Sequence, residues 1–247
     1  MTPRLPDPAL PLARHAATQA SAAALVLLDL DGTLTDSAPG ILASVRHAYR
    51  ALSLPVPDED RMRGFVGPPM QTSLLGHGVA PEQLDDAMAA YREHYSHAML
   101  EATVYPGVVD ALVGLRTALA PGAALVLATS KPEVFAQQIV DHLGLARHLD
   151  AVYGASLDES RLSKASVVAH ALRSEHERTG RAVVPSRAVM VGDRHHDVTG
   201  AGEHGIGCIG VLWGYGSRAE LLDAGAVALA PRPADLVPLV RRALRDG

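Results

Sequence analysis

The sequence predicts an open α/β sheet of parallel strands, flanked by helices, with an all-α segment inserted after the first strand. Two observations predict this fold class. Short apolar runs recur along the chain, each followed by apolar residues at helical spacing, and runs without polar alternation are typical of strands covered on both faces. The first two runs lie about 95 residues apart, which is far more than one crossover connection needs.

The alternation of strand and helix predicts right-handed crossovers between parallel strands. Gly144 and Gly205 each follow a helical pattern, in the position where glycine often ends a helix. The expected strands are residues 24–28, 124–128, 151–153, 188–191, 208–212 and 226–229. The apolar helical positions fall within residues 108–119, 135–143, 168–172 and 236–244.

The pattern predicts a mainly helical segment over residues 38–103, with Pro39 and Pro81 near helix starts, where proline is tolerated. The glycines and prolines of residues 63–69 predict a loop or turn between the helices. We therefore expect a loose extension at residues 1–21, an α/β core of residues 22–37 and 104–247, and a helical module of residues 38–103. The two apolar helix faces comprise Ile41, Val45, Ala48 and Leu52, and Leu84, Met88, Tyr91 and Tyr95.

Composition bounds the class of protein. A chain of 247 residues, 48% hydrophobic and 20% charged, is long enough for one sizeable core and a smaller module. The formal net charge of −5 gives no support to a nucleic-acid or polybasic membrane surface. The single Cys208 excludes an intrachain disulfide. Residues 1–21 lack the apolar stretch of a secretory signal, so we expect a cytoplasmic monomer or homodimer with no nucleic-acid or membrane partner.

Polar side chains follow three of the expected strands at their carboxyl ends, which is where open α/β sheets bind ligands. The first strand leads into two aspartates and a glycine, the second into a threonine, a serine and a lysine, and the fourth into two further aspartates. A second lysine begins the helix before the fourth strand. The residues are Asp29, Asp31, Gly32, Thr129, Ser130, Lys131, Lys164, Asp193 and Asp197.

Asp29 and Asp31 are the two residues whose spacing points most specifically to a function. At a spacing of two in an extended chain both carboxyls can point the same way, and Gly32 permits the tight turn that follows. Two close carboxylates repel unless a cation or a proton lies between them. Oxygen ligands suit Mg²⁺, and Asp193 could supply a further carboxylate. The structural alternative for each aspartate is a helix cap or an Asx turn.

These residues resemble the four motifs of the haloacid dehalogenase superfamily, in order, over about residues 23–245. Asp29-Leu-Asp31-Gly-Thr-Leu-Thr35 is similar to the first motif, Thr129 to the second, Lys164 to the third, and Gly192-Asp193 with Asp197 to the fourth. The resemblance implies a Rossmann-like core, with residues 38–103 as the helical C1 cap domain. Residues 65–69 and 129–133 look most like the phosphoglycolate phosphatase branch.

The resemblance implies a role for each motif residue. Asp29 would be the nucleophile that becomes an aspartyl-phosphate, and Asp31 would be the general acid and base. Mg²⁺ would be held by Asp29, Asp193 and the backbone carbonyl of Asp31. Thr129 would bond a phosphoryl oxygen, and Lys164 would neutralise charge on the phosphate and on Asp29. Asp197 and Ser130 would support the site, and contacts to substrate are expected from Gly32, Thr33, Arg63, Gly67 and Lys131.

The leading hypothesis is a Mg²⁺-dependent phosphatase that acts on a small phosphomonoester of the phosphoglycolate type. A 5′-nucleotidase-like or pyrophosphatase activity and a β-phosphoglucomutase-like phosphotransferase are the alternatives within the superfamily. The presence of Asp31 counts against a dehalogenase, and the absence of lysine from residues 38–103 excludes Schiff-base chemistry in the cap. A non-enzymatic phospho-acceptor module is the alternative from a different class.

Two other signals are weaker. Residues 205–210 match G-x-G-x-x-G but follow a helix and enter a strand, the reverse of the order in a dinucleotide site. The basic residues comprise twenty arginines and only two lysines, Lys131 and Lys164. Because ammonium and guanidinium groups are not interchangeable, we expect the lysines to mark positions where arginine would not serve. Lys131 could be a substrate-side cation or simply precede the helix at Pro132.

Overall fold

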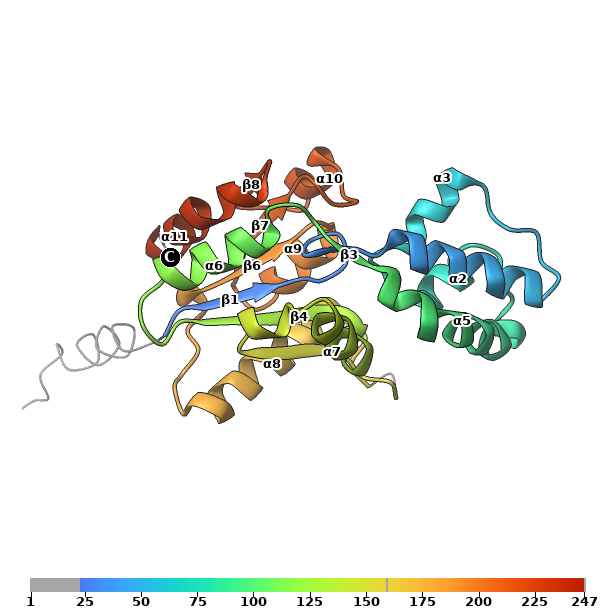
Figure 1. Ribbon diagram of the computed structural model, residues 1–247, viewed down its shortest axis with the longest axis horizontal. Helices are drawn as coiled ribbons and strands as arrows, with labels where there is room; N and C mark the ends of the chain where they lie inside the picture. Colours follow the sequence, from blue (N-terminus) through green and yellow to red (C-terminus); the bar gives the residue numbers. More distant parts are fainter. Residues whose placement is uncertain (1–22, 159, 247) are drawn as a thin grey trace, which may run out of the picture.

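The computed structural model describes residues 23–158 and 160–246. Its core is a six-stranded sheet in which every paired strand is parallel, in the order β5-β4-β1-β6-β7-β8 (Figure 1). All six predicted strands are confirmed, with ends that differ by a few residues. They are β1 (Leu25–Leu28), β4 (Ala124–Pro132), β5 (Ala151–Ala155), β6 (Ala188–Gly192), β7 (Gly207–Val211) and β8 (Ala228–Ala230).

Both faces of the sheet are buried, which explains the uninterrupted apolar runs. Alternate side chains of β1 join different clusters: Val26 and Leu28 pack with one set of helices, Leu25 and Leu27 with the other. The first set is α6 (Val108–Ala118), α7 (Glu133–His142) and α11 (Leu236–Asp246). The second set is α8 (Lys164–Thr179), α9 (His195–Gly202) and α10 (Arg218–Asp223). Short 3₁₀ turns are η4 (Ala146–His148), η5 (Pro185–Arg187) and η6 (Pro233–Asp235).

The segment after β1 is helical and lies beyond the carboxyl end of that strand, apart from the helices that cover the sheet (Figure 1). Its longest helices, α2 and α5, pack against each other. The division of the chain into domains at residues 37 and 104 stays a prediction. The elements are α2 (Ala38–Ala51), α3 (Glu59–Met62), η1 (Arg63–Phe65), α4 (Met70–Gly76), η2 (Pro81–Gln83), α5 (Leu84–Ala98) and η3 (Met99–Glu101).

Two very short strands join the helical module to the core. β2 (Thr35–Asp36) and β3 (Thr103–Val104) form an antiparallel pair, with Thr35 opposite Val104. The chain therefore enters and leaves the module at one place. The Tyr215 hydroxyl donates to Asp36 Oδ1 at 2.8 Å and accepts from the backbone N–H of Ser37 at 3.0 Å, which ties this connection to the core.

The structure adds short elements to those that the sequence predicts. Residues 63–69 were expected as a loop or turn, and within them Arg63–Phe65 form the 3₁₀ turn η1, where Phe65 is buried. The pair β2–β3 and helix α10 were not predicted. The expected loose extension at residues 1–21 lies outside the described residues.

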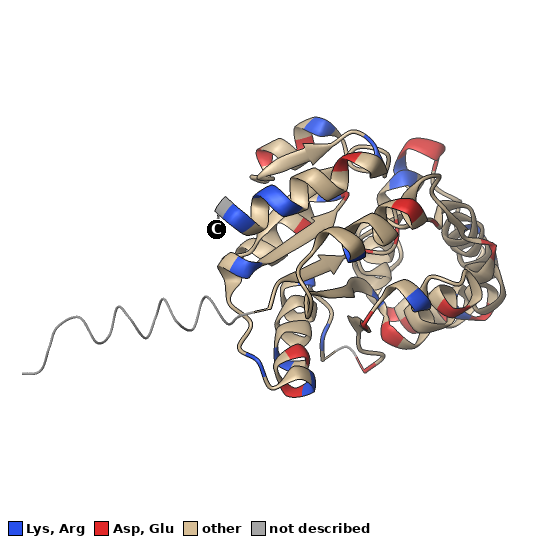
Figure 2. Ribbon diagram, turned by 60° about the vertical axis from the view of Figure 1, so that its left-hand side comes forward, with Lys and Arg blue, Asp and Glu red and all other residues tan. Residues whose placement is uncertain are grey.

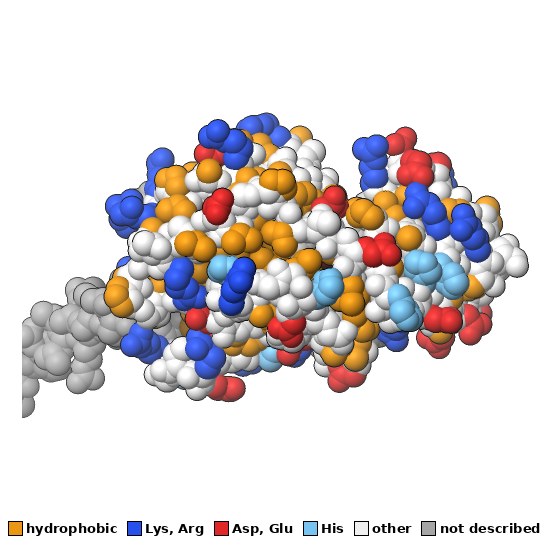
Figure 3. All heavy atoms as spheres, viewed as in Figure 1, with side chains coloured by type: hydrophobic (Ala, Val, Ile, Leu, Met, Phe, Trp, Pro, Cys, Tyr) orange, Lys and Arg blue, Asp and Glu red, His pale blue; other side chains and the backbone are white. Residues whose placement is uncertain are grey.

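Charged residues of both signs are interspersed over the core and the module (Figure 2). Hydrophobic side chains reach the surface mainly in small groups between polar ones on the face in Figure 3. The lone Cys208 is buried in β7. Within residues 23–158 and 160–246, no helix combines the length and the apolar character needed to cross a bilayer.

Candidate active site

The sheet brings the motif residues together because the three strands that carry them are neighbours. Leu28 at the end of β1 lies in register with Leu127 of β4 and Val191 of β6. The chain therefore leaves these strands side by side, and the N–H of Asp29 still donates to the carbonyl of Val191 at 2.9 Å. One small cavity beyond the strand ends is lined by Asp29, Asp31, Gly67, Thr129, Ser130, Lys131, Lys164, Arg194, His196 and Asp197.

Lys164 lies at the centre of the acidic groups. It begins α8, which Ser163 caps by accepting a hydrogen bond from the N–H of Ser166 at 3.1 Å. The buried ammonium has three acceptors: its Nζ lies 2.6 Å from Asp29 Oδ1, 2.6 Å from Asp197 Oδ1 and 2.9 Å from the carbonyl oxygen of Ala128. The contacts with Asp29 and Ala128 are hydrogen bonds and the contact with Asp197 is an ion pair, and together they fix the ammonium beside Asp29.

Burial and mutual repulsion disfavour the ionised forms of the aspartates. Burial raises the pKa of Asp29 to about 7, an effect that the Lys164 ammonium opposes and the Asp197 carboxylate adds to. Burial, together with repulsion from Asp197 and Asp29, holds the pKa of Asp193 well above its usual range. Burial alone would lower the pKa of Lys164, but Asp197 and Asp29 raise it above its usual value. Ionisation of all three carboxylates would therefore leave more negative charge than Lys164 balances, unless a further cation is bound.

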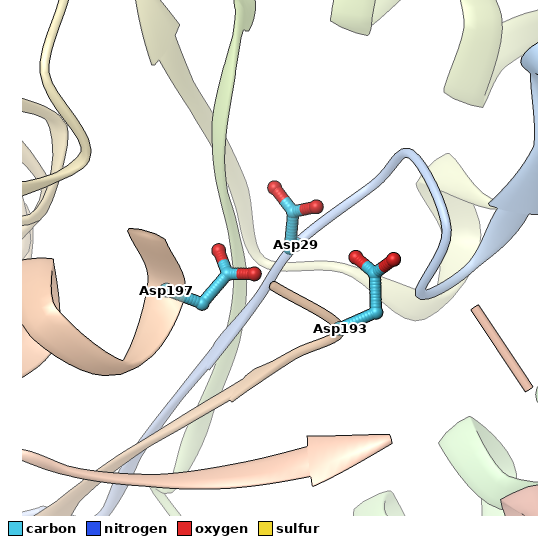
Figure 4. A group of neighbouring side chains, drawn as sticks. All are labelled: Asp29, Asp193 and Asp197. Atoms are coloured by element: carbon cyan, nitrogen blue, oxygen red, sulfur yellow. The ribbon is translucent and has the colours of Figure 1, made fainter. Parts of the chain in front are cut away.

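Asp29, Asp193 and Asp197 fit a divalent cation. All three are buried, and one oxygen from each lies within 4.8 Å of the others. In Figure 4 their carboxylates lie close together, from the end of β1, the loop after β6 and the start of α9. A set of oxygen donors alone suits Mg²⁺, and a cation there would relieve the repulsion described above. The Asp31 side chain is not in this cluster. The expected ligand from Asp31 was its backbone carbonyl, not its carboxylate.

The Asp31 carboxylate is held by different partners. The Ser37 hydroxyl donates to its Oδ1 at 2.5 Å, and Lys131 Nζ lies 2.9 Å from its Oδ2. The Asp31 carboxylate is therefore bound by Ser37 and Lys131 rather than by Lys164, and it lines the same cavity as Asp29. Lys131 also donates to the hydroxyl of Tyr95, on helix α5 of that module.

Gly32 and Thr33 contact the carboxylate cluster rather than the cavity. Gly32 has a φ of +84°, and a Cβ there would lie 2.2 Å from Asp193 Oδ2, so only glycine allows Asp193 to approach. The Thr33 hydroxyl donates to Asp193 Oδ1 at 3.4 Å. Arg63 is exposed and lines neither this cavity nor the apolar one next to it. The structure does not bring these three residues to the cavity, and their contacts to substrate stay predictions.

Sequence reasoning missed Arg194, which links core and module. Its Nη1 donates to the carbonyl of Val66 at 2.6 Å, and its Nε donates to Glu220 at 2.8 Å. Glu220 also accepts from the backbone N–H of His195 at 3.0 Å. Arg194 stands inside the fourth motif, but its partners are 128 and 26 residues away, so no local pattern reveals them.

A second cavity, mainly apolar, adjoins the first and shares Asp31, Gly67, Ser130 and Lys131 with it. Helix α5 contributes Tyr91 and Tyr95, whose rings stack with centroids 5.2 Å apart. The sequence placed these tyrosines on an apolar helix face, but it gave no sign that they border the site. The other apolar residues that line this cavity are Ile41, Phe65, Pro68, Pro69, Met70, Met88, Pro132, Phe135, Ala155, Leu157 and Leu162.

Comparison with known proteins gives consistent matches. Residues 26–211 match the family described as haloacid dehalogenase-like hydrolase. Tyrosine-protein kinase PtkA of Mycobacterium tuberculosis is 42% identical over 224 residues, which are 90% of this chain and 73% of that protein. The 5′-nucleotidase of Pseudomonas aeruginosa is 38% identical over 198 residues, 79% of this chain and 86% of that protein. Phosphoglycolate phosphatase 1 of the same organism is 28% identical, over 89% and 80% of the two chains.

Solved structures agree with these sequence matches. A predicted phosphatase from Clostridium acetobutylicum superposes with a TM-score of 0.81 and is 37% identical in sequence. The match covers 90% of this chain and 100% of that one. The fold is thus shared with a protein of related sequence.

Proposed function

Because the chain belongs to the haloacid dehalogenase-like hydrolase family, we propose that it hydrolyses a phosphomonoester with the help of Mg²⁺ and through an aspartyl-phosphate intermediate. The family predicted from the four motifs is confirmed, and the chain is a phosphatase of this family. The observation that carries the mechanism is the buried Asp29 carboxylate, which shares one cavity with Thr129 and lies 2.6 Å from Lys164.

In the proposed first step an oxygen of Asp29 forms a bond to phosphorus while the ester oxygen leaves. Asp31 gives its proton to the leaving oxygen, so that an alcohol departs rather than an alkoxide. Lys164 compensates the charge on the phosphoryl oxygens and on Asp29. The Thr129 hydroxyl accepts from the N–H of Lys131 at 3.2 Å, which leaves its own hydrogen free for a phosphoryl oxygen.

In the second step Asp31, now a carboxylate, accepts a proton from water, and the water oxygen attacks phosphorus. The bond from Asp29 to phosphorus breaks, and inorganic phosphate leaves. Asp197 keeps Lys164 beside Asp29 throughout, through its 2.6 Å ion pair. Asp29, Asp193 and the carbonyl of Asp31 would hold Mg²⁺, with Asp197 close by, and the bound ion supplies additional compensation for phosphoryl charge.

The first prediction tests the nucleophile. With Mg²⁺ the wild-type protein is expected to hydrolyse p-nitrophenyl phosphate, and Asp29→Asn is expected to lose this activity because an amide cannot form the acyl-phosphate. Release of p-nitrophenol is the measurement, with thermal unfolding as a check of folding. Asp141→Asn, an exposed aspartate on α7, is the matched control and should keep full activity. Activity that survives a chelator, or an active Asp29→Asn variant, contradicts the mechanism.

The apolar cavity favours a substrate larger than phosphoglycolate. It adjoins Asp31, on the side where the leaving group departs, and aromatic side chains form much of its wall. Such a wall binds flat apolar groups well, and the cations Arg92 and Lys131, which also line the cavity, offer partners to an anionic group. The aromatic side chains of the cavity favour the nucleotidase-like alternative, and the relatives named 5′-nucleotidase, tyrosine-protein kinase and phosphoglycolate phosphatase make nucleoside monophosphates, phosphotyrosine and phosphoglycolate the substrates to test.

The second prediction concerns this leaving-group cavity. Across a panel of nucleoside 5′-monophosphates, aryl phosphates, phosphotyrosine, sugar phosphates, pyrophosphate and phosphoglycolate, kcat/KM is expected to be highest for esters with an aromatic group. Phe135→Ala is expected to lower it about tenfold for these esters, since an aromatic contact contributes about 0.5–1.5 kcal/mol beyond its buried area, and to leave phosphoglycolate unaffected. A preference for phosphoglycolate would restore the original substrate prediction.

A further inference from the structure

The loop of residues 213–216, Trp-Gly-Tyr-Gly, lies between β7 and α10 and is anchored to the chain that follows β1. Two side chains make the anchors. The indole N–H of Trp213 donates to the carbonyl of Thr33 at 3.0 Å, and the Tyr215 hydroxyl donates to Asp36 Oδ1 at 2.8 Å. The 213–216 loop is therefore tied down on both sides of the glycine that separates the two aromatic residues.

The backbone of the same loop holds the Asp193 carboxylate. The N–H of Tyr215 donates to Asp193 Oδ2 at 2.7 Å, whereas the Thr33 hydroxyl donates to Oδ1 over a longer distance, 3.4 Å. Asp193 is completely buried, and a buried carboxylate is costly unless donors satisfy its oxygens. The orientation of the Asp193 carboxylate therefore depends mainly on where the 213–216 loop presents this N–H group.

Two glycines allow the loop to approach Asp193 this closely. A Cβ at Gly216 would overlap the carbonyl oxygen of Asp193, and a Cβ at Gly214 would lie 2.5 Å from the Cβ of Asp193. A larger residue at either position would push the loop and Asp193 apart. The sequence of the loop thus alternates a side chain that anchors it with a glycine that admits close packing.

We propose that the 213–216 loop is a positioning element for Asp193, and that it sets the place and direction of this carboxylate in the metal site. The inference rests on the proposed function, since it takes Asp193 as a ligand of Mg²⁺. Groups that hydrogen-bond a metal ligand fix its orientation, and their replacement lowers metal affinity by about 10- to 100-fold. Trp213 and Tyr215 act through the backbone that they hold in place.

The test measures Mg²⁺ binding by calorimetric titration of the metal-free protein, without any substrate. Gly216→Ala is expected to raise the Kd for Mg²⁺ at least about tenfold, because the added methyl group displaces Asp193. Gly202→Ala is the matched control, since nothing lies within 4 Å of its added Cβ, and its Kd should stay within about twofold of wild type. Equal Kd values for the two variants would overturn the proposal.

Tyr215→Phe carries the test if Gly216→Ala unfolds. It keeps the N–H that binds Asp193 and removes only the anchoring hydroxyl, so it is expected to raise the Kd less, about three- to tenfold. Tyr49→Phe is its control, because that hydroxyl donates to the carbonyl of His77 at 3.1 Å, away from the site. A merely structural role predicts a lower Tm in chelator for Tyr215→Phe with an unchanged Kd, and that result would contradict the positioning role.

Asp193→Asn separates this proposal from the proposed function. If Asp193 is a ligand, wild type binds Mg²⁺ and Asp193→Asn binds it at least about tenfold more weakly. Failure of either result refutes the assigned metal site, and the inference falls with it. If both results hold but the loop variants bind Mg²⁺ like wild type, only the positioning role is wrong. Adding Tyr215→Phe to Asp193→Asn should cost less than about twofold more, because the loop acts through Asp193.

Discussion

Lys164 shows that the site needs a cation of a particular shape and not only a positive charge. Its Nζ lies 2.6, 2.6 and 2.9 Å from three oxygen atoms in a buried space. A guanidinium is planar and larger, and it presents its donors as a rigid fork. The same charge on an arginine therefore cannot reproduce these contacts without moving Asp29 or Asp197.

Lys164→Arg is accordingly expected to keep the fold and to lose at least about a hundredfold in kcat, the size of effect seen when one preorganised donor is removed from an active site. Steady-state kinetics with p-nitrophenyl phosphate measures this loss. Arg173→Lys, a conservative change at an exposed position of the same helix, should leave kcat within twofold of wild type. A near-normal rate for Lys164→Arg would mean that the geometry of the ammonium is unimportant.

Residues of the site were predictable from sequence where they follow strands, and unpredictable where their partners are distant. Asp29, Thr129 and Lys164 belong to motifs, and the order of the strands brings them together. Arg194 and Tyr95 make their contacts across the boundary between core and module, and no local spacing encodes which side chains meet there. The expected substrate contact of Arg63 followed from its charge, but its side chain is exposed.

At the scale of elements, the close approach of α8 and α9 positions the third and fourth motifs. Gly200 on α9 faces the start of α8, and a Cβ there would lie 2.8 Å from both Cβ and Cγ of Lys164. Gly202 lies two residues further along the same helix, and nothing lies within 4 Å of its added Cβ. The two glycines provide a matched pair within one element.

Gly200→Ala is expected to lower the free energy of unfolding by about 1–3 kcal/mol, the usual cost of overpacking, and to reduce kcat by displacing Lys164. Gly202→Ala should be neutral or stabilise by up to about 1 kcal/mol, because alanine favours helix more than glycine does. Chemical denaturation and steady-state kinetics on both variants measure these effects. Equal stability of the two variants would show that α8 can shift freely.

Elements with long apolar runs were the predictable ones. The six strands are covered on both faces, so each gave an unbroken apolar run in the sequence. The strands β2 and β3 have two residues each, too few to show any periodicity. Helix α10 has six residues, of which only Leu221 is buried, so it carries no amphipathic pattern.

For the whole molecule, the buried carboxylates link stability to pH. The folded-state pKa of Asp29, about 7, lies above its ordinary value of 3.8, and burial also raises the pKa of Asp193. Between pH 4 and pH 7 the folded protein therefore binds more protons at Asp29 than the unfolded chain does. In the absence of metal this group lowers stability progressively as the pH rises through that window.

Mg²⁺ is expected to reverse this trend, because it competes with protons for the same carboxylates. The rise in Tm on adding saturating Mg²⁺ should be larger at pH 8 than at pH 5.5, and Asp193→Asn should abolish most of it. Thermal unfolding in chelator and in Mg²⁺ at the two pH values measures the difference. An equal rise in Tm at both pH values would contradict proton competition at the cluster.

The paired strands β2 and β3 have a consequence for evolution and engineering. Because Thr35 lies opposite Val104, the whole helical insertion departs from and returns to adjacent points on the core. Its length and sequence can therefore diversify between lineages without changing the register of any strand in the six-stranded sheet. The proposed catalytic groups lie in the core, so exchange of residues 38–101 is expected to change the preference for leaving groups while the positions of those groups stay the same.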